Sequence, residues 1–313
     1  MIIVITGPTG VGKTRLSEEL SSKYHMPIIN SDSMQVYKEL NIGTAKIKDE
    51  EKNNMPHYLF DIKNPDENYT VFDYQKDIRK ILENNKNVIL VGGTGLYIKA
   101  ALYNYEFEER EKSEEYNDLT NEELYQKLLS KGINNIHKNN RQRMISALNS
   151  NGNNNLKDEL LYDDVYFIGL TTDRKELYKI IDDRVDQMIE EGLVEEVKSL
   201  YKKYGKTKSL MTGIGYKEII SFLDGEISLE EAIKKIKTNS RHYAKRQYTW
   251  FNNQMNIKWF NIDYLDFDNT IKDVENYIGW LILNCKLYYL LGNTYCLGAY
   301  LHKEVIWWVR KTF

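Results

Sequence analysis

Residues 2–14 read IIVITGPTGVGKT, and this stretch decides the fold. Ile2–Thr6 is a short, β-branched, apolar run, which is typical of a strand buried on both faces. Gly7–Thr14 then matches the pattern G-x-x-x-x-G-K-[ST] at every fixed position, and a helical pattern follows it. The sequence therefore predicts a P-loop at the carboxyl end of the first strand of a parallel α/β sheet.

The chemistry of this loop points to a phosphate ligand. Its glycines allow a tight turn that directs successive N–H groups at phosphate oxygens, and the following helix adds the positive end of its dipole. Lys13 would bring its positive charge close to the terminal phosphate, and Thr14 would offer a hydroxyl to Mg²⁺. The predicted phosphate-binding residues are Gly7, Pro8, Thr9, Gly10, Val11, Gly12, Lys13 and Thr14. The pattern does not distinguish a nucleoside triphosphate from a diphosphate ester.

Strand and helix signals alternate on the C-terminal side of this loop. Further strand-like runs are Pro27–Asn30, Tyr58–Ile62, Val88–Val91 and Val165–Leu170, and helical periodicity marks Thr14–Tyr24, Val71–Leu82, Lys175–Leu200 and the stretch from Ser228 to Phe251. This alternation favours a P-loop NTPase-like parallel sheet with helices on both faces.

The middle and the end of the chain depart from this pattern. Residues 105–164 are charged, Asn-rich and without strand signals, with helices expected near Thr120–Ser130 and Asn139–Leu148. We therefore expect a core formed by 1–104 and 165–280, a helical insertion at 105–164, and an anomalous apolar tail at 281–313. Lys286 interrupts the tail, and a central Lys costs about 3 kcal/mol on membrane insertion. A packed element or a non-native extension is favoured over a membrane span, and we expect truncation at Tyr277 to preserve activity.

Composition excludes several other classes. The 313 residues carry a formal net charge of -3, with 42% hydrophobic and 28% charged residues, as in ordinary soluble domains. Two cysteines, Cys285 and Cys296, provide neither a disulfide framework nor a zinc site. The first strand occupies the place of a signal peptide, so we expect a cytoplasmic protein without a membrane anchor. We separately expect a monomer.

Two side chains outside the loop are candidates for catalysis. Asp32 follows the second strand, at the sheet edge where parallel α/β proteins bind ligands, and could act as a general base. A turn or N-cap aspartate explains it equally well. Arg184 could clamp phosphates from a helix, or form a surface ion pair with neighbouring aspartates. The run Gly92–Gly95 allows close approach of a ligand, although a tight turn is the simpler explanation.

Basic residues gather in two stretches. Lys198–Lys208 has five lysines, and Lys234–Arg246 has six basic residues and no acidic one, with Tyr243, Tyr248 and Trp250 within or just beyond it. Basic residues mixed with aromatic ones suit a nucleic acid, but a solvated helix face is the commoner explanation.

Taken together, these stretches resemble the tRNA dimethylallyltransferase (tRNA isopentenyltransferase) family, in the family's order and with about its spacing. The matching pieces cover most of the chain to about Ile262: GPTGVGKT (7–14), INSDSMQVYKELNIGTAK (29–46), VGGTGLYIKA (91–100), RVDQMIEEGLVEEV (184–197), GIGYKEI (213–219) and RHYAKRQYTWF (241–251).

The resemblance implies transfer of a dimethylallyl group from its diphosphate to N6 of the adenosine next to the anticodon, on the 3′ side. Lys13 and Arg184 would hold the diphosphate, Thr14 the Mg²⁺, and Asp32 would be the general base; the insertion would grip the anticodon arm. The residues expected to contact tRNA are Asp32, Ser33, Met34, Gln35, Thr94, Gln142, Arg143, Met144, Ile145, Ser146, Thr212, Gly213, Ile214, Gly215, Tyr216 and Lys217, together with Arg241, Lys245 and Arg246 of the basic stretch.

The chain also departs from the family pattern. The insertion is shorter than expected, Ser146 stands where an arginine is usual, His57-Tyr58 replaces paired histidines, and nothing in the family resembles the tail. A small-molecule kinase using ATP is the main alternative function, since it explains the P-loop, Asp32 and Arg184 but neither the insertion nor the basic stretch. A prenyltransferase acting on free adenine nucleotides would not need the insertion.

Overall fold

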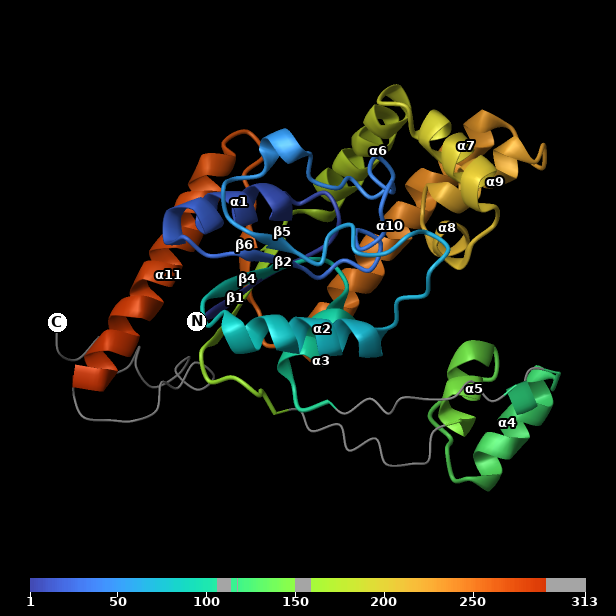
Figure 1. Ribbon diagram of the computed structural model, residues 1–313, viewed down its shortest axis with the longest axis horizontal. Helices are drawn as coiled ribbons and strands as arrows, with labels where there is room; N and C mark the ends of the chain where they lie inside the picture. Colours follow the sequence, from blue (N-terminus) through green and yellow to red (C-terminus); the bar gives the residue numbers. More distant parts are fainter. Residues whose placement is uncertain (106–113, 117, 150–158, 291–313) are drawn as a thin grey trace. The chain divides into compact units, whose positions relative to one another are not determined.

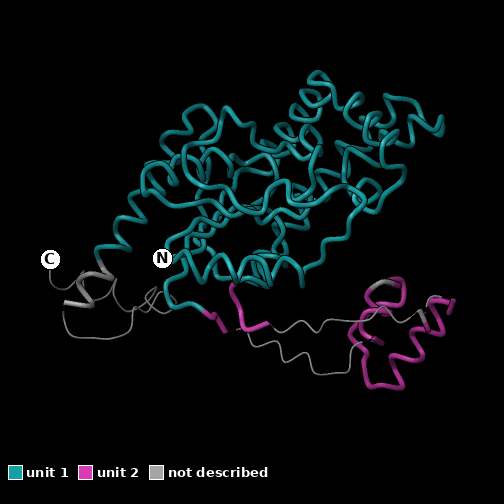
Figure 2. The backbone as a smooth tube through the Cα atoms, viewed as in Figure 1, with its two compact units in different colours: residues 1–101, 162–313 teal, residues 102–161 magenta. Residues whose placement is uncertain are grey.

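The computed structural model describes residues 1–105, 114–116, 118–149 and 159–290. The chain divides into two compact units: unit 1 is formed by residues 1–101 and 162–313, and unit 2 by residues 102–161 (Figure 2). Each unit is described by itself. The candidate catalytic residues all belong to unit 1.

Unit 1 is built on one parallel sheet of six strands in the order β3-β2-β4-β1-β5-β6 (Figure 1). The strands are β1 (Ile2–Thr6), β2 (Ile28–Asn30), β3 (His57–Tyr58), β4 (Val88–Val91), β5 (Val165–Thr171) and β6 (Lys258–Asn261). The predicted parallel α/β class is confirmed. β1, entirely buried, lies between β4 and β5, so the loop that follows it begins at the middle of the sheet.

Two details of the sheet differ from the prediction. The strand expected at 58–62 is shorter, because Leu59 and Asp61 have positive φ angles of 64° and 53° and turn the chain out of the extended conformation. β6 was not predicted. Its side chains are only half-buried or exposed, so it lacks the apolar run that marks the other strands.

Helices cover both faces of this sheet (Figure 1). On one face lie α1 (Lys13–Tyr24) and α11 (Phe267–Leu290), and on the other α2 (Val71–Asn84) and α3 (Gly95–Leu102). Ile3 and Ile5 of β1 share a buried apolar cluster with Leu16 of α1 and Val274 of α11. A short 3₁₀ turn, η1 (Asp49–Glu51), lies in the connection between β2 and β3.

A second group of helices extends from one end of unit 1: α6 (Arg174–Glu190), α7 (Leu193–Tyr204), α8 (Lys208–Thr212), α9 (Tyr216–Leu223) and α10 (Leu229–Gln254). The single helix expected over Lys175–Leu200 is wrong. Gly192 has a left-handed φ of 102°, which ends α6 and starts α7 in a new direction. The apolar periodicity continues across this break, because both helices bury one face.

Unit 2 contains α4 (Asn121–Ser130) and α5 (Arg141–Leu148), with the short 3₁₀ turn η2 (Glu114–Tyr116). Thr120 and Glu123 form a capping box at the start of α4, each side chain satisfying an N–H group at the helix end. Leu124, Leu128 and Met144 bury a small core of their own. An antiparallel bridge between Tyr103 and Leu160 joins the two ends of the unit.

The first part of the predicted tail is a continuation of α11, and residues 291–313 lie outside the described part of the chain. Ile278 is 1% exposed within the core of unit 1, so the truncation expected to be harmless at Tyr277 would remove a core side chain. Within the described residues, no helix combines the length and the apolarity that crossing a membrane requires.

Candidate active site

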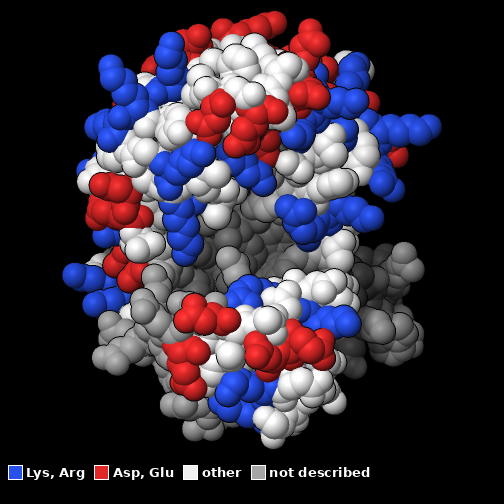
Figure 3. Space-filling view, turned by 90° about the vertical axis from the view of Figure 1, so that its right-hand side faces the viewer, with Lys and Arg blue, Asp and Glu red and all other residues white. Residues whose placement is uncertain are grey.

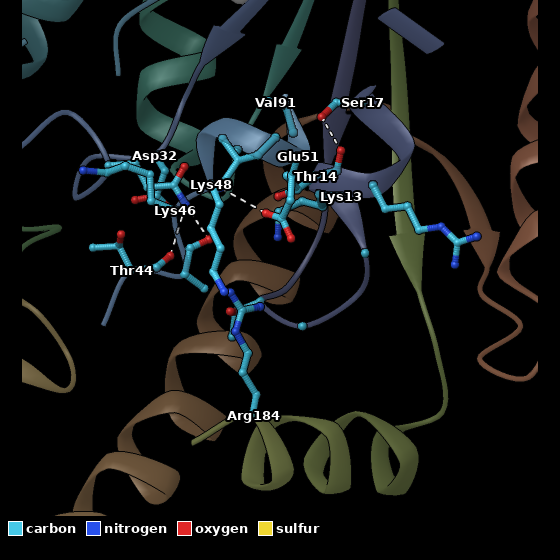
Figure 4. A pocket seen from close by; sticks show the side chains of 18 of the residues that line it. Lys13, Thr14, Ser17, Asp32, Thr44, Lys46, Lys48, Glu51, Val91 and Arg184 are labelled. Atoms are coloured by element: carbon cyan, nitrogen blue, oxygen red, sulfur yellow. Dashed lines mark hydrogen bonds between the residues drawn. The ribbon is translucent and has the colours of Figure 1, made fainter. Parts of the chain in front are cut away.

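A cleft of about 880 Å³ opens where β1, β2 and β4 end. Its walls come from the P-loop, the loop after β2, the 41–51 segment, α6 and α10. Lys13, Thr14, Asp32 and Arg184 all line it, and Figure 4 shows Arg184 reaching from α6 into the same space as the P-loop residues. Four side chains from three separate segments are therefore brought together as the sequence suggested.

The P-loop has the backbone conformation that its glycines permit. Gly7, Gly10 and Gly12 have φ angles of 137°, 88° and 80°, a region that side-chain-bearing residues rarely adopt. The Lys13 ammonium donates to the carbonyl oxygens of Gly7 at 3.1 Å and Pro8 at 2.7 Å. Burial and, to a smaller extent, the nearby Arg184 cation lower the pKa of Lys13 to about 7, and the Asp32 carboxylate opposes this shift. A bound anion would favour the charged form.

Arg184 is half-buried at the opposite side of this cleft. Burial lowers its pKa, and the Asp32 carboxylate counteracts the shift. Among the described residues, no carboxylate lies within salt-bridge distance of Arg184, whereas the neighbouring Asp182 and Asp186 pair with Arg241 and Lys237. The surface ion pair considered from the sequence is thus made by its neighbours, and Arg184 remains available to an anionic ligand.

Asp32 is held in a tight local turn. Its backbone N–H donates to the Asn30 side chain at 2.8 Å, and its Oδ1 accepts the N–H of Met34 at 2.9 Å. No described residue donates to Oδ2. The turn and the general-base interpretations are therefore compatible, because one oxygen fixes the carboxylate and the other remains for a substrate proton.

The segment 33–46 forms the wall next to Asp32, and it is tied down at several points. The Ser33 N–H donates to Thr94 Oγ1 at 3.1 Å, and Gln35 Nε2 donates to the Thr44 carbonyl at 3.1 Å. Lys46, almost fully buried, donates to Asp61 at 2.6 Å. Of the predicted tRNA contacts in this region, Gln35 lines the cleft directly.

Glu196 of α7 holds the tip of the same segment. Its carboxylate accepts the N–H groups of Asn41 at 3.2 Å, Ile42 at 2.8 Å and Gly43 at 3.1 Å, and the hydroxyl of Tyr216 at 2.8 Å. Gly43 must lack a side chain, because a Cβ there would lie 2.6 Å from the Tyr216 ring. Glu196 lies within the stretch 184–197 that carries the resemblance, but it was not among the predicted site residues.

The tRNA contacts predicted at 212–217 differ from one another in their exposure. The Tyr216 side chain is fully buried and bonded to Glu196, so the tRNA contact expected for it has no accessible side chain in this structure. Gly213 and Gly215 are buried as well, and Ile214 is half-buried. Thr212 is exposed and Lys217 half-buried, and these two polar side chains can still meet a partner.

Helix α10 has two faces with different tasks. Lys245 and Arg246 are exposed, while Tyr243 and Gln247 line the cleft. Gln247 is 5% exposed; its Oε1 accepts the Thr9 N–H at 3.0 Å and its Nε2 donates to the Gly93 carbonyl at 3.0 Å. Neither cleft residue was among the predicted site residues. Only one feature of the sequence could have indicated them: they lie four residues apart, and thus on one face of a helix whose other face is basic.

The basic stretches are partly neutralised. Arg241 pairs with Asp182, Lys203 with Glu39 at 2.7 Å, and Lys206 with Asp224 at 2.8 Å. Figure 3 views the side on which α7–α9 lie, and Lys and Arg side chains there are interspersed with Asp and Glu. The Lys198–Lys208 stretch thus includes ion-paired lysines, as a solvated helix face would.

The connection between β6 and α11, together with the first residues of α11, packs against the P-loop and stabilises it. The Tyr264 hydroxyl donates to the Gly10 carbonyl at 2.5 Å, and Asp268 pairs with Arg15 at 2.7 Å. The Phe267 ring lies against Gly12, where a Cβ would approach it to 2.6 Å. The phosphate-binding loop at the start of the chain is therefore supported by residues more than 250 positions later.

The remaining tRNA candidates lie in α5 of unit 2. The helix contains Gln142–Ser146; Met144 is buried in the core of the unit, whereas Arg143 and Ser146 are exposed.

Comparison with known proteins identifies relatives of this chain. The family model described as IPP transferase matches residues 35–254. The chain belongs to the IPP transferase family. This match confirms the resemblance found in the sequence.

The curated relatives span most of the chain. The tRNA dimethylallyltransferase of Anoxybacillus flavithermus is 42% identical over 298 residues, covering 88% of this chain and 96% of the relative. That of Bacillus licheniformis is 44% identical over 285 residues, covering 83% and 90%. These names favour prenyl transfer over the kinase alternative.

Solved structures agree with the fold. The tRNA isopentenylpyrophosphate transferase of Bacillus halodurans aligns with a TM-score of 0.71 at 38% identity, covering 92% of this chain and 99% of that one. A eukaryotic dimethylallyltransferase acting on tRNA aligns with a TM-score of 0.77 at 27% identity, covering 94% and 80%.

Proposed function

We propose that this enzyme transfers a dimethylallyl group from dimethylallyl diphosphate to N6 of the adenosine that is 3′-adjacent to the anticodon of certain tRNAs. Membership of the IPP transferase family supports the type of reaction, which is transfer of a prenyl group to tRNA. The single observation that carries the assignment of roles is that one cleft is lined by the P-loop, by Arg184 and by Asp32.

The donor side of the cleft suits a diphosphate leaving group. The P-loop N–H groups and the Lys13 and Arg184 cations surround a space in which burial disfavours both positive charges. Breaking the bond between the allylic carbon and oxygen places additional negative charge on the diphosphate. Fixed cations and N–H groups stabilise this charge in the transition state without reorganisation.

Mg²⁺ fits the same place. The Thr14 hydroxyl lines the cleft without a partner among the described residues. No group of three or more His, Cys, Asp or Glu side chains that could hold a metal occurs in the described part of the chain. A Mg²⁺ ion retains waters and binds phosphate oxygens with few protein ligands, so this arrangement suits it. Thr14 would hold the ion, which would neutralise charge on the diphosphate when bound.

Asp32 is the proposed general base. As the new bond forms between N6 and the allylic carbon, the amine loses a proton to the Asp32 carboxylate and diphosphate departs. The adenosine must leave its stacked loop to reach the cleft. Gln35 and Thr94 stand beside Asp32 and are proposed to contact the flipped base, while α5 of unit 2 is proposed to grip the anticodon arm.

The test is a transfer assay with labelled dimethylallyl diphosphate, Mg²⁺ and unmodified tRNA. Label should enter tRNA with adenosine 3′ to the anticodon, and not a matched tRNA with guanosine there. Asp32→Asn should lower kcat by at least about 10²-fold while preserving binding of inorganic pyrophosphate. Labelling of both tRNAs would refute the proposed acceptor, and full activity of Asp32→Asn would refute the proposed base.

A further inference from the structure

Gln247 connects the two sides of the cleft. Its amide accepts a hydrogen bond from Thr9 in the P-loop and donates one to Gly93 in the loop after β4. Thr94, the next residue, accepts the Ser33 N–H adjacent to Asp32. A continuous set of contacts therefore runs from the phosphate-binding loop through Gln247 to the segment that carries the candidate base.

The fit around this amide is tight. Gln247 is 5% exposed, and a Cβ on Gly93 would lie 2.1 Å from its Nε2 and 3.3 Å from its Cδ. Gly93 cannot accept a side chain while the amide occupies its place, because the contact is far shorter than van der Waals separation. Tyr243, one turn earlier on α10, lines the same cleft; burial raises the pKa of its hydroxyl, and the neighbouring Thr94 and Gln247 side chains oppose this shift.

We propose that Gln247 is a positioning residue that fixes the P-loop relative to the Asp32 segment and thereby aligns the allylic donor with the accepting amine. This inference rests on the proposed function. A transfer reaction between two bound substrates depends on holding the reacting atoms in line, and a misplacement of about 1 Å can cost on the order of 10²-fold in rate. A residue that only spans the two loops can therefore control kcat without touching either substrate.

The first experiment compares Gln247→Ala with Asn252→Asp, a change at an exposed position on the same helix. The parent enzyme must transfer label, which tests the proposed function separately. In Gln247→Ala, kcat should fall at least about tenfold while the tRNA dissociation constant stays within about twofold. Asn252→Asp should match the parent. A folded Gln247→Ala variant with parental kcat at a temperature well below its unfolding transition would overturn the proposal.

The second experiment is a double-mutant cycle with Gly93→Ala. Alone, this substitution should displace the Gln247 amide and reproduce the kcat loss of Gln247→Ala. Combined with Gln247→Ala, it should cost little more, because the clashing amide is gone. Additive losses of kcat would show that the two residues act independently, and would contradict the role assigned to Gln247.

Discussion

Replacing Glu196 by Gln tests whether α7 holds the wall of the cleft. The carboxylate accepts three backbone N–H groups and one phenol hydroxyl. An amide has nearly the same shape but only one acceptor oxygen. Its NH₂ group must therefore face at least one of the donors that Glu196 now satisfies.

The cost follows from these contacts. If the new NH₂ group faces Gly43 and Tyr216, the phenol can rotate to accept, and one backbone N–H loses its partner. If it faces Asn41 and Ile42, two N–H groups lose theirs. At about 1.5–3 kcal/mol for each charge-assisted bond, we expect a loss of about 2–4 kcal/mol in the free energy of unfolding. This corresponds to a decrease in Tm of roughly 5–10 °C.

Two quantities are measured for Glu196→Gln: the Tm of thermal unfolding, and the transfer activity at a temperature at which the variant is folded. Because Ile42 and Thr44 line the cleft, kcat/KM for tRNA should also fall. Lys203→Met is the matched control: it removes an ion pair between α7 and Glu39 that solvent screens, so we expect little change in stability. A Glu196→Gln protein as stable and as active as the Lys203→Met control would refute the reasoning.

Three further predictions concern other contacts of the same unit. Arg184→Lys should lower kcat about tenfold or more in the transfer assay, since an ammonium cannot reproduce a bidentate phosphate contact; unchanged kcat would remove Arg184 from the site. Tyr264→Phe deletes the bond to Gly10 and should raise the KM for dimethylallyl diphosphate roughly threefold to tenfold without changing the KM for tRNA; an equal change in both constants would contradict a local effect on the P-loop. Gly192→Ala should lower the free energy of unfolding by about 1–2 kcal/mol in a denaturant titration, because φ there is 102°; a more stable protein would show that the α6–α7 break does not need glycine.

The sequence predicted the centre of unit 1 well because its signals are local. A β-branched run followed by GPTGVGKT specifies strand, loop and helix within about twenty residues, and Asp32 follows the next strand directly. The break at Gly192 was missed because the apolar periodicity continues on both sides of it. β6 was missed because its residues Lys258–Asn261 carry no buried apolar run.

The missed site residues have a different physical cause. Gln247 and Tyr243 act through the inner face of α10, while the exposed lysines and arginines of the same helix dominate its composition. Glu196 acts on backbone N–H groups more than 150 positions away. Pairing of a carboxylate with distant backbone groups leaves no local pattern, so only the folded arrangement reveals it.

The contacts of Tyr264, Phe267 and Asp268 with the P-loop region have a consequence for biosynthesis. The phosphate-binding loop leaves the ribosome long before the elements that support it. β1 needs β4 and β5 as neighbours, and Tyr264, Phe267 and Asp268, which contact the loop, follow β6 in the sequence. At roughly 5–20 residues per second, the interval from Thr14 to Asp268 is about 10–50 s. During that time the nascent chain carries a complete phosphate-binding motif without its complete support. We therefore expect the loop to bind phosphate firmly only after α11 has begun to form.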